Sequence, residues 1–238
     1  MLAFGGCTGP ASAAPPQLCA DLALFNSALK SWSTPRCSGA APAPVMHHAA
    51  VLVGTAVYVF GGRTASGATN TLHRFNVMTN AWAPVSATGD VPAPRYLHSM
   101  CLAAPNAKAF VIYGGCDGTK TFDDAYLFNT ETNAWSRIEP PAGSAVPQAR
   151  CGHAAESLGN AMWVYGGDAG ATGDGSKPLS DLWKLDLATK TWSQFAVGAD
   201  DTRRADLLWS IAASYASVPA IKLAWLDSLF QHNKRTGM

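Results

Sequence analysis

Short apolar runs alternate along the chain with clusters of glycine, asparagine, threonine and proline. Between residues 47 and 85 four such runs follow one another, with the sequences HHAAVLV, AVYVFGG, TLHRFNV and AWAPV. Short apolar runs bounded by turn-forming residues are typical of β-strands. The pattern predicts a four-stranded antiparallel sheet with two apolar faces, which must stack against a neighbouring unit to be buried.

An aromatic residue directly before a pair of glycines recurs four times. The copies are MLAFGG, VYVFGG, FVIYGG and MWVYGG, and their second glycines, Gly6, Gly62, Gly115 and Gly167, lie 56, 53 and 52 residues apart. A nearly constant period of this length indicates a repeat architecture in which each copy is one supersecondary unit.

Two further features keep the same register. A large apolar residue precedes a tryptophan by seven positions in every copy, in the pairs Phe25 and Trp32, Phe75 and Trp82, Phe128 and Trp135, and Leu185 and Trp192. Upstream, a proline stands six residues before His48, His98 and His153, and Arg95 and Arg150 align with Val45. The first copy lacks this upstream part and begins at its second strand.

These motifs together resemble the kelch repeat family over roughly Met1–Phe195. The resemblance implies an all-β, kelch-type β-propeller that is incomplete, with three full blades and a partial N-terminal blade. We expect the blades at about residues 1–36, 37–87, 88–141 and 142–197, with the tryptophans packed between them. Family members usually close a ring of six or seven blades, so we expect a truncated product or an arc that self-associates through open blade edges.

The sequence changes character after the last repeat. Residues 198–238 lack strand alternation, and apolar residues at helical spacing on both sides of Pro219 predict two short amphipathic helices, or a partly disordered tail. Charged residues and Pro219 interrupt its apolar runs, so no membrane anchor is expected. A net charge of +1 without a basic run argues against nucleic acid as a partner. The start MLAFGG lacks the basic region of a signal peptide, so we expect a cytoplasmic protein.

The glycine pairs and cysteines invite a catalytic interpretation that the repeat argues against. No helix is expected after any pair, as a phosphate loop would require, so the glycines are interpreted as structural. Cys116 aligns with Cys7, Arg63 and Asp168, and no base accompanies it, which favours an ordinary thiol. The six cysteines form no Cys-x-x-Cys pair and are interpreted as reduced thiols rather than a disulfide framework.

Several other polar residues belong to the types that bind metals or act as catalysts. The three aligned histidines lie in different repeats, so an architectural role is favoured over a metal site. Asp123 and Asp124 are neighbours that point to opposite faces of a strand, which suits a strand entrance better than an acid/base pair. We therefore expect no catalytic residue, no metal and no cofactor.

The remaining candidates for partner binding lie near the ends of strands. Arg95 and Arg150 precede the inner strands, where a guanidinium can hold a carboxylate of a ligand or, alternatively, carbonyl groups of an adjacent blade. Two copies carry long Gly-, Ala-, Ser- and Pro-rich insertions after the glycine pair, CTGPASAAPPQLCA and DAGATGDGSKPLSD. The expected partner-binding residues are Arg95, Tyr96, Arg150, Asp168, Asp174 and Lys177.

The resemblance implies a function as well as a fold. It favours a non-enzymatic protein-interaction module or scaffold that holds a protein partner through its loops. The alternatives are a kelch-fold enzyme or enzyme remnant, such as an oxidase, a sugar isomerase or a specifier-like protein, or a truncated product of a larger kelch protein.

Overall fold

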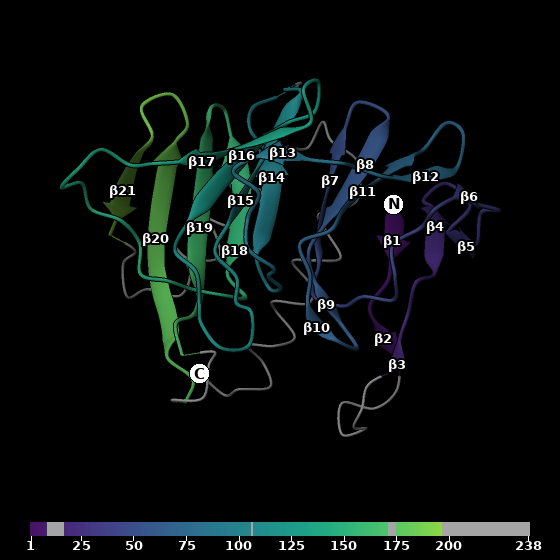
Figure 1. Cartoon of the computed structure of the whole chain (residues 1–238), viewed down its shortest axis with the longest axis horizontal. Helices are drawn as coiled ribbons and strands as arrows, with labels where there is room; N and C mark the ends of the chain where they lie inside the picture. Colours follow the sequence, from purple (N-terminus) through teal and green to yellow (C-terminus); the bar gives the residue numbers. More distant parts are fainter. Residues whose placement is uncertain (9–16, 106, 171–174, 197–238) are drawn as a thin grey trace. The chain divides into compact units, whose positions relative to one another are not determined.

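All regular elements of the described chain are β-strands. A computed structural model describes residues 1–8, 17–105, 107–170 and 175–196, and no helix occurs in them. The two helices expected in residues 198–238 lie outside the described residues. The strands fall into two compact units: β1, β4 and β5 form the smaller, and all other strands belong to the larger (Figure 1).

The smaller unit is the partial N-terminal blade that the sequence predicts. Its strands β1 (Leu2–Phe4), β4 (Leu22–Asn26) and β5 (Ser31–Ser33) form an antiparallel sheet in the order β1-β4-β5. The sheet lacks the first strand of the other blades because the upstream part of the repeat is missing from this copy.

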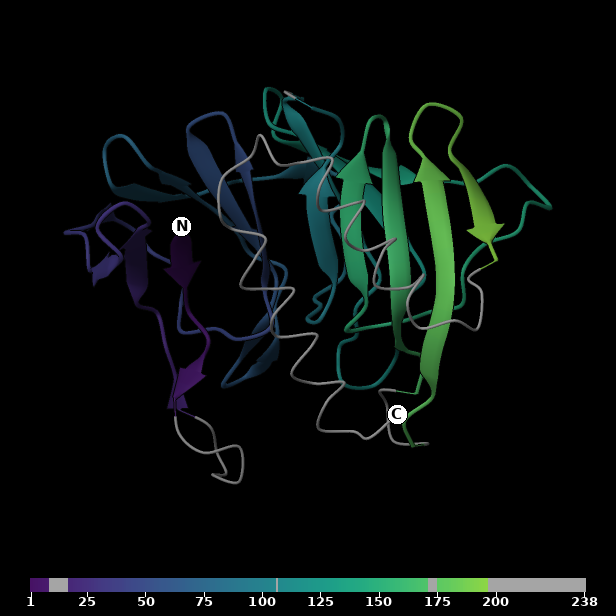
Figure 2. The same ribbon diagram turned by 180° about the vertical axis from the view of Figure 1, so that it is seen from behind.

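The larger unit contains three complete blades, each an antiparallel meander of four strands. The second blade contains β7 (Ala49–Val53), β8 (Ala56–Phe60), β11 (Leu72–Asn76) and β12 (Ala81–Pro84). The third contains β14 (Ser99–Leu102), β15 (Ala109–Tyr113), β16 (Ala125–Asn129) and β17 (Ala134–Ile138). The fourth contains β18 (Ala154–Leu158), β19 (Ala161–Asp168), β20 (Pro178–Asp186) and β21 (Thr191–Phe195). The three sheets stand side by side when seen from the front and from behind (Figures 1 and 2).

Each interface between consecutive blades of the larger unit has its own apolar core. One buried cluster joins Tyr58 and Phe60 of the second blade to Phe110, Phe128 and Trp135 of the third. A second cluster joins Val111 and Tyr113 of the third blade to Met162, Leu185 and Trp192 of the fourth. The tryptophan of one blade meets the aromatic residue before the glycine pair of the preceding blade, with ring centroids 5.0 Å apart for Trp135 and Phe60 and 4.9 Å for Trp192 and Tyr113. The predicted packing of tryptophans between blades is confirmed at these two interfaces.

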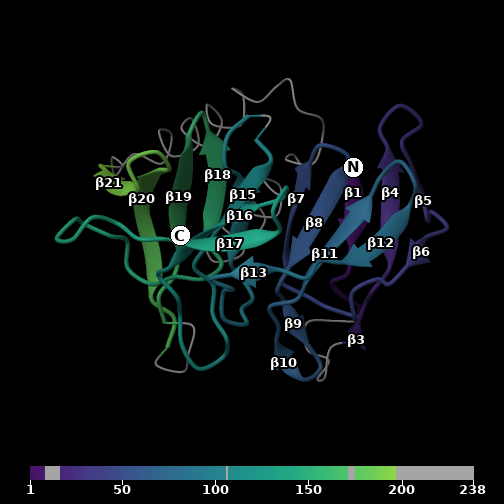
Figure 3. The same cartoon turned by 45° about the horizontal axis from the view of Figure 1, so that its top comes forward.

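Short additional strands lie at both ends of the blades. Hairpins β2 (Cys7–Thr8) with β3 (Gln17–Leu18), and β9 (Arg63–Thr64) with β10 (Gly67–Ala68), follow glycine pairs at the lower end in Figure 1. In addition, β6 (Ser38–Gly39) pairs in parallel with β12, and β13 (Thr88–Gly89) with β17 (Figure 3). The strand pattern did not predict β6 and β13, which cover the outer edges of the second and third blades.

The turn between the third and fourth strands is built alike in all four copies. The side-chain oxygen of Asn26, Asn76, Asn129 or Asp186 accepts hydrogen bonds from the backbone N–H groups two and three residues further on. The residue before the last strand has positive φ in each copy, at Lys30, Asn80, Asn133 and Lys190. Asparagine tolerates this conformation better than other residues with a side chain, which explains the Thr-Asn-Ala-Trp motif of two copies.

Candidate functional site

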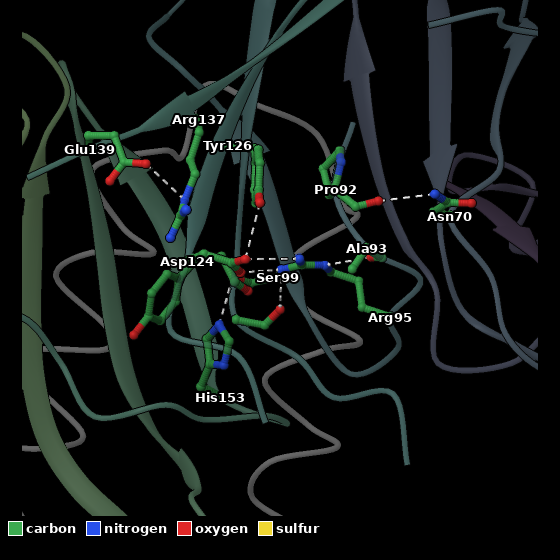
Figure 4. A network of polar contacts seen from close by, with 12 residues as sticks. Asn70, Pro92, Ala93, Arg95, Ser99, Asp124, Tyr126, Arg137, Glu139 and His153 are labelled. Atoms are coloured by element: carbon green, nitrogen blue, oxygen red, sulfur yellow. Dashed lines mark hydrogen bonds and ion pairs between the residues drawn. The ribbon is translucent and has the colours of Figure 1, made fainter. Parts of the chain in front are cut away.

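Arg95 and Arg150 are the most buried charged residues of the described chain, and each is held inside its own blade. Arg95 donates from Nη1 to the Gly114 carbonyl at 3.0 Å and to Asp124 Oδ1 at 2.6 Å, and from Nε to the Ala93 carbonyl at 3.1 Å (Figure 4). The Arg95 side chain is 0% exposed. This guanidinium therefore has no surface to offer to a ligand.

The fourth blade repeats this arrangement with its own residues. Arg150 donates from Nη1 to the Gly166 carbonyl at 2.9 Å, and its two terminal nitrogens reach the Asp181 carboxylate at 2.7 and 2.8 Å. The hydrogen bonds from Arg150 lower the pKa of Asp181. The structure thus supports the alternative of carbonyl binding, with one correction: the carbonyls belong to the same blade and not to an adjacent one.

A third side chain completes each of these buried pairs. Tyr126 donates its hydroxyl to Asp124 Oδ2 at 3.2 Å, and Trp183 donates Nε1 to Asp181 Oδ2 at 2.6 Å. In the third blade the guanidinium of Arg95 also lies over the ring of Phe122, 4.2 Å from its centroid. A buried charge is stable only when it is paired and hydrogen-bonded, and these contacts meet that requirement.

Asp124 and Asp181 are residues whose role sequence reasoning missed. Both stand directly before the apolar run of a third strand, as AYLFN follows Asp124 and LWKLD follows Asp181. The two copies that contain the arginine also contain an aspartate at this position. This coincidence is the sequence signal that would have identified the pair. Asp124 stands at the entrance of β16, as the sequence predicts, and its carboxylate binds Arg95.

The glycine pairs bring neighbouring blades into close contact. All eight glycines have positive φ, and a Cβ on Gly61 would lie 2.6 Å from the Arg95 carbonyl oxygen of the next blade. A Cβ on Gly114 would likewise lie 2.6 Å from the Arg150 carbonyl oxygen. The structural interpretation of the pairs is confirmed. In the fourth blade strand β19 continues through its pair with a register shift, because the long strand β20 pairs with it beyond Gly167.

The aligned histidines are packed against these glycines. Carbon Cε1 of His98 lies 2.9 Å from a Cβ placed on Gly61, and His153 occupies the same position over Gly114. Burial lowers the pKa of both imidazoles, so they are neutral near pH 7. His153 Nε2 is 2.7 Å from Ser99 Oγ, whereas neither ring nitrogen of His98 has a hydrogen-bond partner among the described residues.

His47 is separate from this set. It is exposed, has a φ of 56°, and precedes strand β7 instead of lying within it. No group of three or more His, Cys, Asp or Glu side chains in the described ranges is arranged to hold a metal ion.

Cys116 differs from the ordinary loop thiol that the sequence predicts. Cys116 and Cys151 are free, buried, and hydrogen-bonded to each other across the interface of the third and fourth blades. Their backbones are held together because the N–H of Gly115 donates to the Arg150 carbonyl at 2.9 Å. The hydrogen bond from Cys151 lowers the pKa of Cys116 to about 7, and the Tyr96 hydroxyl adds to this effect.

The other predicted contact residues lie around the loops that follow the glycine pairs. Tyr96 is half-buried, and its ring centroid is 5.8 Å from the guanidinium carbon of Arg63. Asp168 Oδ1 accepts from the backbone N–H groups of Gly170 at 2.7 Å and Lys177 at 2.8 Å, so this carboxylate closes its own loop. Lys177 is exposed, and Asp174 lies outside the described residues.

The second blade lacks the buried ion pair. Val45 stands where Arg95 and Arg150 stand in the next two blades, and Thr71 stands where Asp124 and Asp181 stand. A cavity of about 210 Å³ occupies this place, lined by Pro42, Ala43, Val45, Val59, Gly61, Thr64, Thr69, Thr71 and His73.

No helix long and apolar enough to cross a membrane occurs in the described residues. The stacked four-stranded blades, with arginine, glycine and tryptophan at equivalent positions in successive copies, define a repeat protein of the β-propeller class. A sequence profile described as the KLHDC2/KLHL20/DRC7 Kelch-repeats domain matches residues 1–207. The chain belongs to the kelch repeat family.

Individual relatives extend this comparison. Kelch domain-containing protein 10 of Xenopus tropicalis is 30% identical over 200 residues, which cover 82% of this chain and 46% of that protein. The human protein of the same name is 29% identical over 198 residues, covering 81% of this chain and 42% of the relative. Acyl-CoA-binding domain-containing protein 5 of Arabidopsis thaliana is 31% identical over 195 residues, or 81% of this chain and 28% of that protein. The chain thus spans less than half the length of these relatives.

Proposed function

We propose that this chain is a non-enzymatic module that binds another protein through the loops that follow its glycine pairs. The observation that carries the proposal is a difference between the recurring residues and the loop residues of the repeat. The residues that recur in register, among them Arg95, Gly114 and Trp135, form packing contacts and hydrogen bonds within and between blades. The exposed residues of the loops differ from copy to copy, as expected of a surface that recognises one particular partner.

The loops contain exposed charged side chains that can form ion pairs with a protein partner. Arg63 is exposed in the second blade, Lys120 in the third and Lys177 in the fourth. The Asp117 carboxylate accepts from the N–H groups of Thr119 at 2.7 Å and Lys120 at 2.9 Å, which fixes the third-blade loop. A fixed loop loses little conformational entropy on binding, which favours its use as a recognition surface.

Site-specific photo-crosslinking tests the proposal. A photoreactive amino acid replaces Lys120 or Lys177 in the full chain, or Met78 in the turn at the other end of the blade as the matched control; Met78 is 75% exposed. We expect the two loop positions to give the same discrete crosslinked protein in cells and the Met78 position to give none. Charge reversal at the unlabelled loop lysine should abolish the crosslink without changing the thermal midpoint.

Two outcomes contradict the proposal. One is a crosslink of equal yield from Met78, and the other is no crosslink from either loop while the chain is folded. The predicted cytoplasmic location forms part of the same proposal, and fractionation of the labelled cells tests it.

A further inference from the structure

The cavity of the second blade has the same backbone frame as the filled site of the third. The N–H of Gly61 donates to the Thr71 carbonyl at 3.1 Å, as Gly114 does to Asp124. The N–H of Gly62 donates to the Arg95 carbonyl at 2.8 Å, as Gly115 does to Arg150 at 2.9 Å. The frame is therefore intact, and the difference between the blades lies in the side chains.

Four side chains that fill the site in the third blade are replaced together in the second. Val45, Thr69, Thr71 and His73 stand at the positions of Arg95, Phe122, Asp124 and Tyr126. The long arginine, its carboxylate and two aromatic rings are lost, while the surrounding strands keep their register. The result is the cavity of about 210 Å³, and Thr71 beside it is exposed to solvent.

The other blades show which chemistry this frame accepts. Backbone carbonyls at two equivalent places hold the planar N–H donors of an arginine: those of Ala93 and Gly114 in the third blade, and those of Gln148 and Gly166 in the fourth. Ala43 and Gly61 occupy these places in the second blade and line the cavity. These two carbonyls accept from different nitrogens of the arginine, Nε and Nη1. The single NH₂ group of a small ligand can therefore donate to one of them, the Gly61 carbonyl that stands at the place of the Nη1 acceptor.

The absence of charged side chains around the second-blade cavity indicates the charge of the ligand. No carboxylate lines the cavity, and burial lowers the pKa of His73, so no charged side chain faces the ligand near pH 7. A guanidinium would lose its hydration without gaining the carboxylate that Arg95 and Arg150 have. A neutral N–H donor can still hydrogen-bond to a backbone carbonyl of the frame. It does not bring an unpaired charge into the cavity.

We propose that the second-blade cavity between Val45, Gly61 and Thr71 binds a primary carboxamide on a short apolar stem, such as the side chain of a glutamine. The carboxamide NH₂ donates to the carbonyl of Gly61, and Thr71 donates its hydroxyl to the carboxamide oxygen. The stem lies against Val45 and Val59. This site is separate from the exposed loop charges that support the proposed function, and does not depend on them.

Titration of the full chain with small probes tests the site. Propionamide is the carboxamide probe, and propionate and propylguanidinium are its charged counterparts, with the methyl resonances of Val45 and Val59 as the readout. We expect saturable shifts of these methyls with propionamide and at least about tenfold weaker binding of either ion, because neither ion finds a counter-charge in the cavity.

Variants separate this site from weak binding elsewhere. The double variant Val45→Arg, Thr71→Asp recreates the pair of the third blade and should abolish the response, with Val59 reporting. Val45→Met fills the cavity without a new charge and should also abolish it if the double variant does not fold. Absence of saturable shifts in the unaltered chain, tighter binding of propylguanidinium, or an unchanged response in a folded filling variant would each overturn the proposal.

Discussion

Lys190 holds a backbone conformation that its side chain disfavours. Its φ of 59° lies in the left-handed region, where the equivalent residues of the second and third blades are Asn80 and Asn133. The side chain is exposed and forms no part of the core. The cost is therefore one of backbone strain alone.

Lys190→Asn should stabilise the chain by about 0.5–1 kcal/mol, because asparagine occupies this region at lower cost. Urea denaturation of the two proteins measures the difference. The reverse change, Asn133→Lys, should destabilise by a similar amount. Equal stability of all three proteins would contradict the explanation.

The unpartnered imidazole of His98 offers a second test at single-residue scale. Ser99 of the third blade contacts His153 of the fourth, whereas the residue equivalent to Ser99 in the second blade is Ala49, which has no hydroxyl for His98. Ala49→Ser should supply the missing hydrogen bond and stabilise by about 1 kcal/mol. Ala154→Ser is the matched control at the same position of the fourth blade and should bring no gain, which chemical denaturation can decide.

Elements were predicted well where apolar runs form a strand pattern and poorly where a strand is too short to show one. The four strands of each complete blade follow from alternating apolar runs, and the partial first blade follows from the missing proline and histidine. The strands β6 and β13 were not predicted because each is only two residues long and consists of Ser-Gly or Thr-Gly, a composition typical of a turn. Their glycines are required because a Cβ on Gly39 or Gly89 would lie 2.0 or 2.2 Å from a carbonyl oxygen of the neighbouring strand.

The candidate site was predicted less well than the strands, for a physical reason. Arg95 and Arg150 were found from their register, but their partners lie 29 and 31 residues further along the chain, and strand pairing alone brings them together. The contact between Cys116 and Cys151 depends in the same way on how two blades meet. The spacing of residues along a repeat shows which positions are equivalent. It does not show which residues are in contact in the folded chain.

The thiol pair at the interface of the third and fourth blades should form a disulfide with hydrogen peroxide as oxidant. The Cys116 thiolate attacks peroxide to give a sulfenic acid and hydroxide, and the Cys151 thiol then displaces water to form the S–S bond. The rate should rise as the pH passes about 7, because the pKa of Cys116 is lowered to about 7. Peptide mass mapping should show a cross-linked pair that has lost two hydrogens.

Two comparisons make this prediction specific. Cys151→Ser should stop the reaction at the sulfenic acid, which a dimedone probe traps. Cys37 is an exposed thiol that serves as an internal reference. Oxidation of Cys37 before any change at the buried pair would contradict the assigned reactivity.

The whole molecule should lose stability in mild acid because several of its histidines are wholly or partly buried. Burial lowers the pKa of His48 to about 4 and that of His153 to about 3, from an ordinary value of 6.5, and the charges of His47 and Arg150 add to these respective shifts. His98, near Arg95, His153 and His48, shifts in the same direction. Below pH 6.5 the unfolded chain therefore binds protons that the folded chain does not.

The histidine contribution to the free energy of unfolding should consequently be constant above about pH 7. It should fall as the pH decreases from 6.5 toward 4, by up to about tenfold in the folding constant per histidine and pH unit. Urea denaturation across this range measures the slope, and His153→Gln should reduce it by one proton. The lowered pKa of Asp181 acts only below its ordinary value of 3.8 and does not contribute to this window. Stability that stays level or rises from pH 6.5 to 4.5 would contradict the prediction.

The parallel strands β6 and β13 have a consequence for how such an array can grow. Each belongs to the segment that immediately precedes its own blade, and each covers the outer edge of that same blade. A gene duplication that copies residues 37–87 or 88–141 therefore transmits the edge cover together with the sheet. The array can therefore gain a repeat in one genetic event whose outer strand is already paired. A newly added blade then has no unpaired outer strand that could aggregate with other chains.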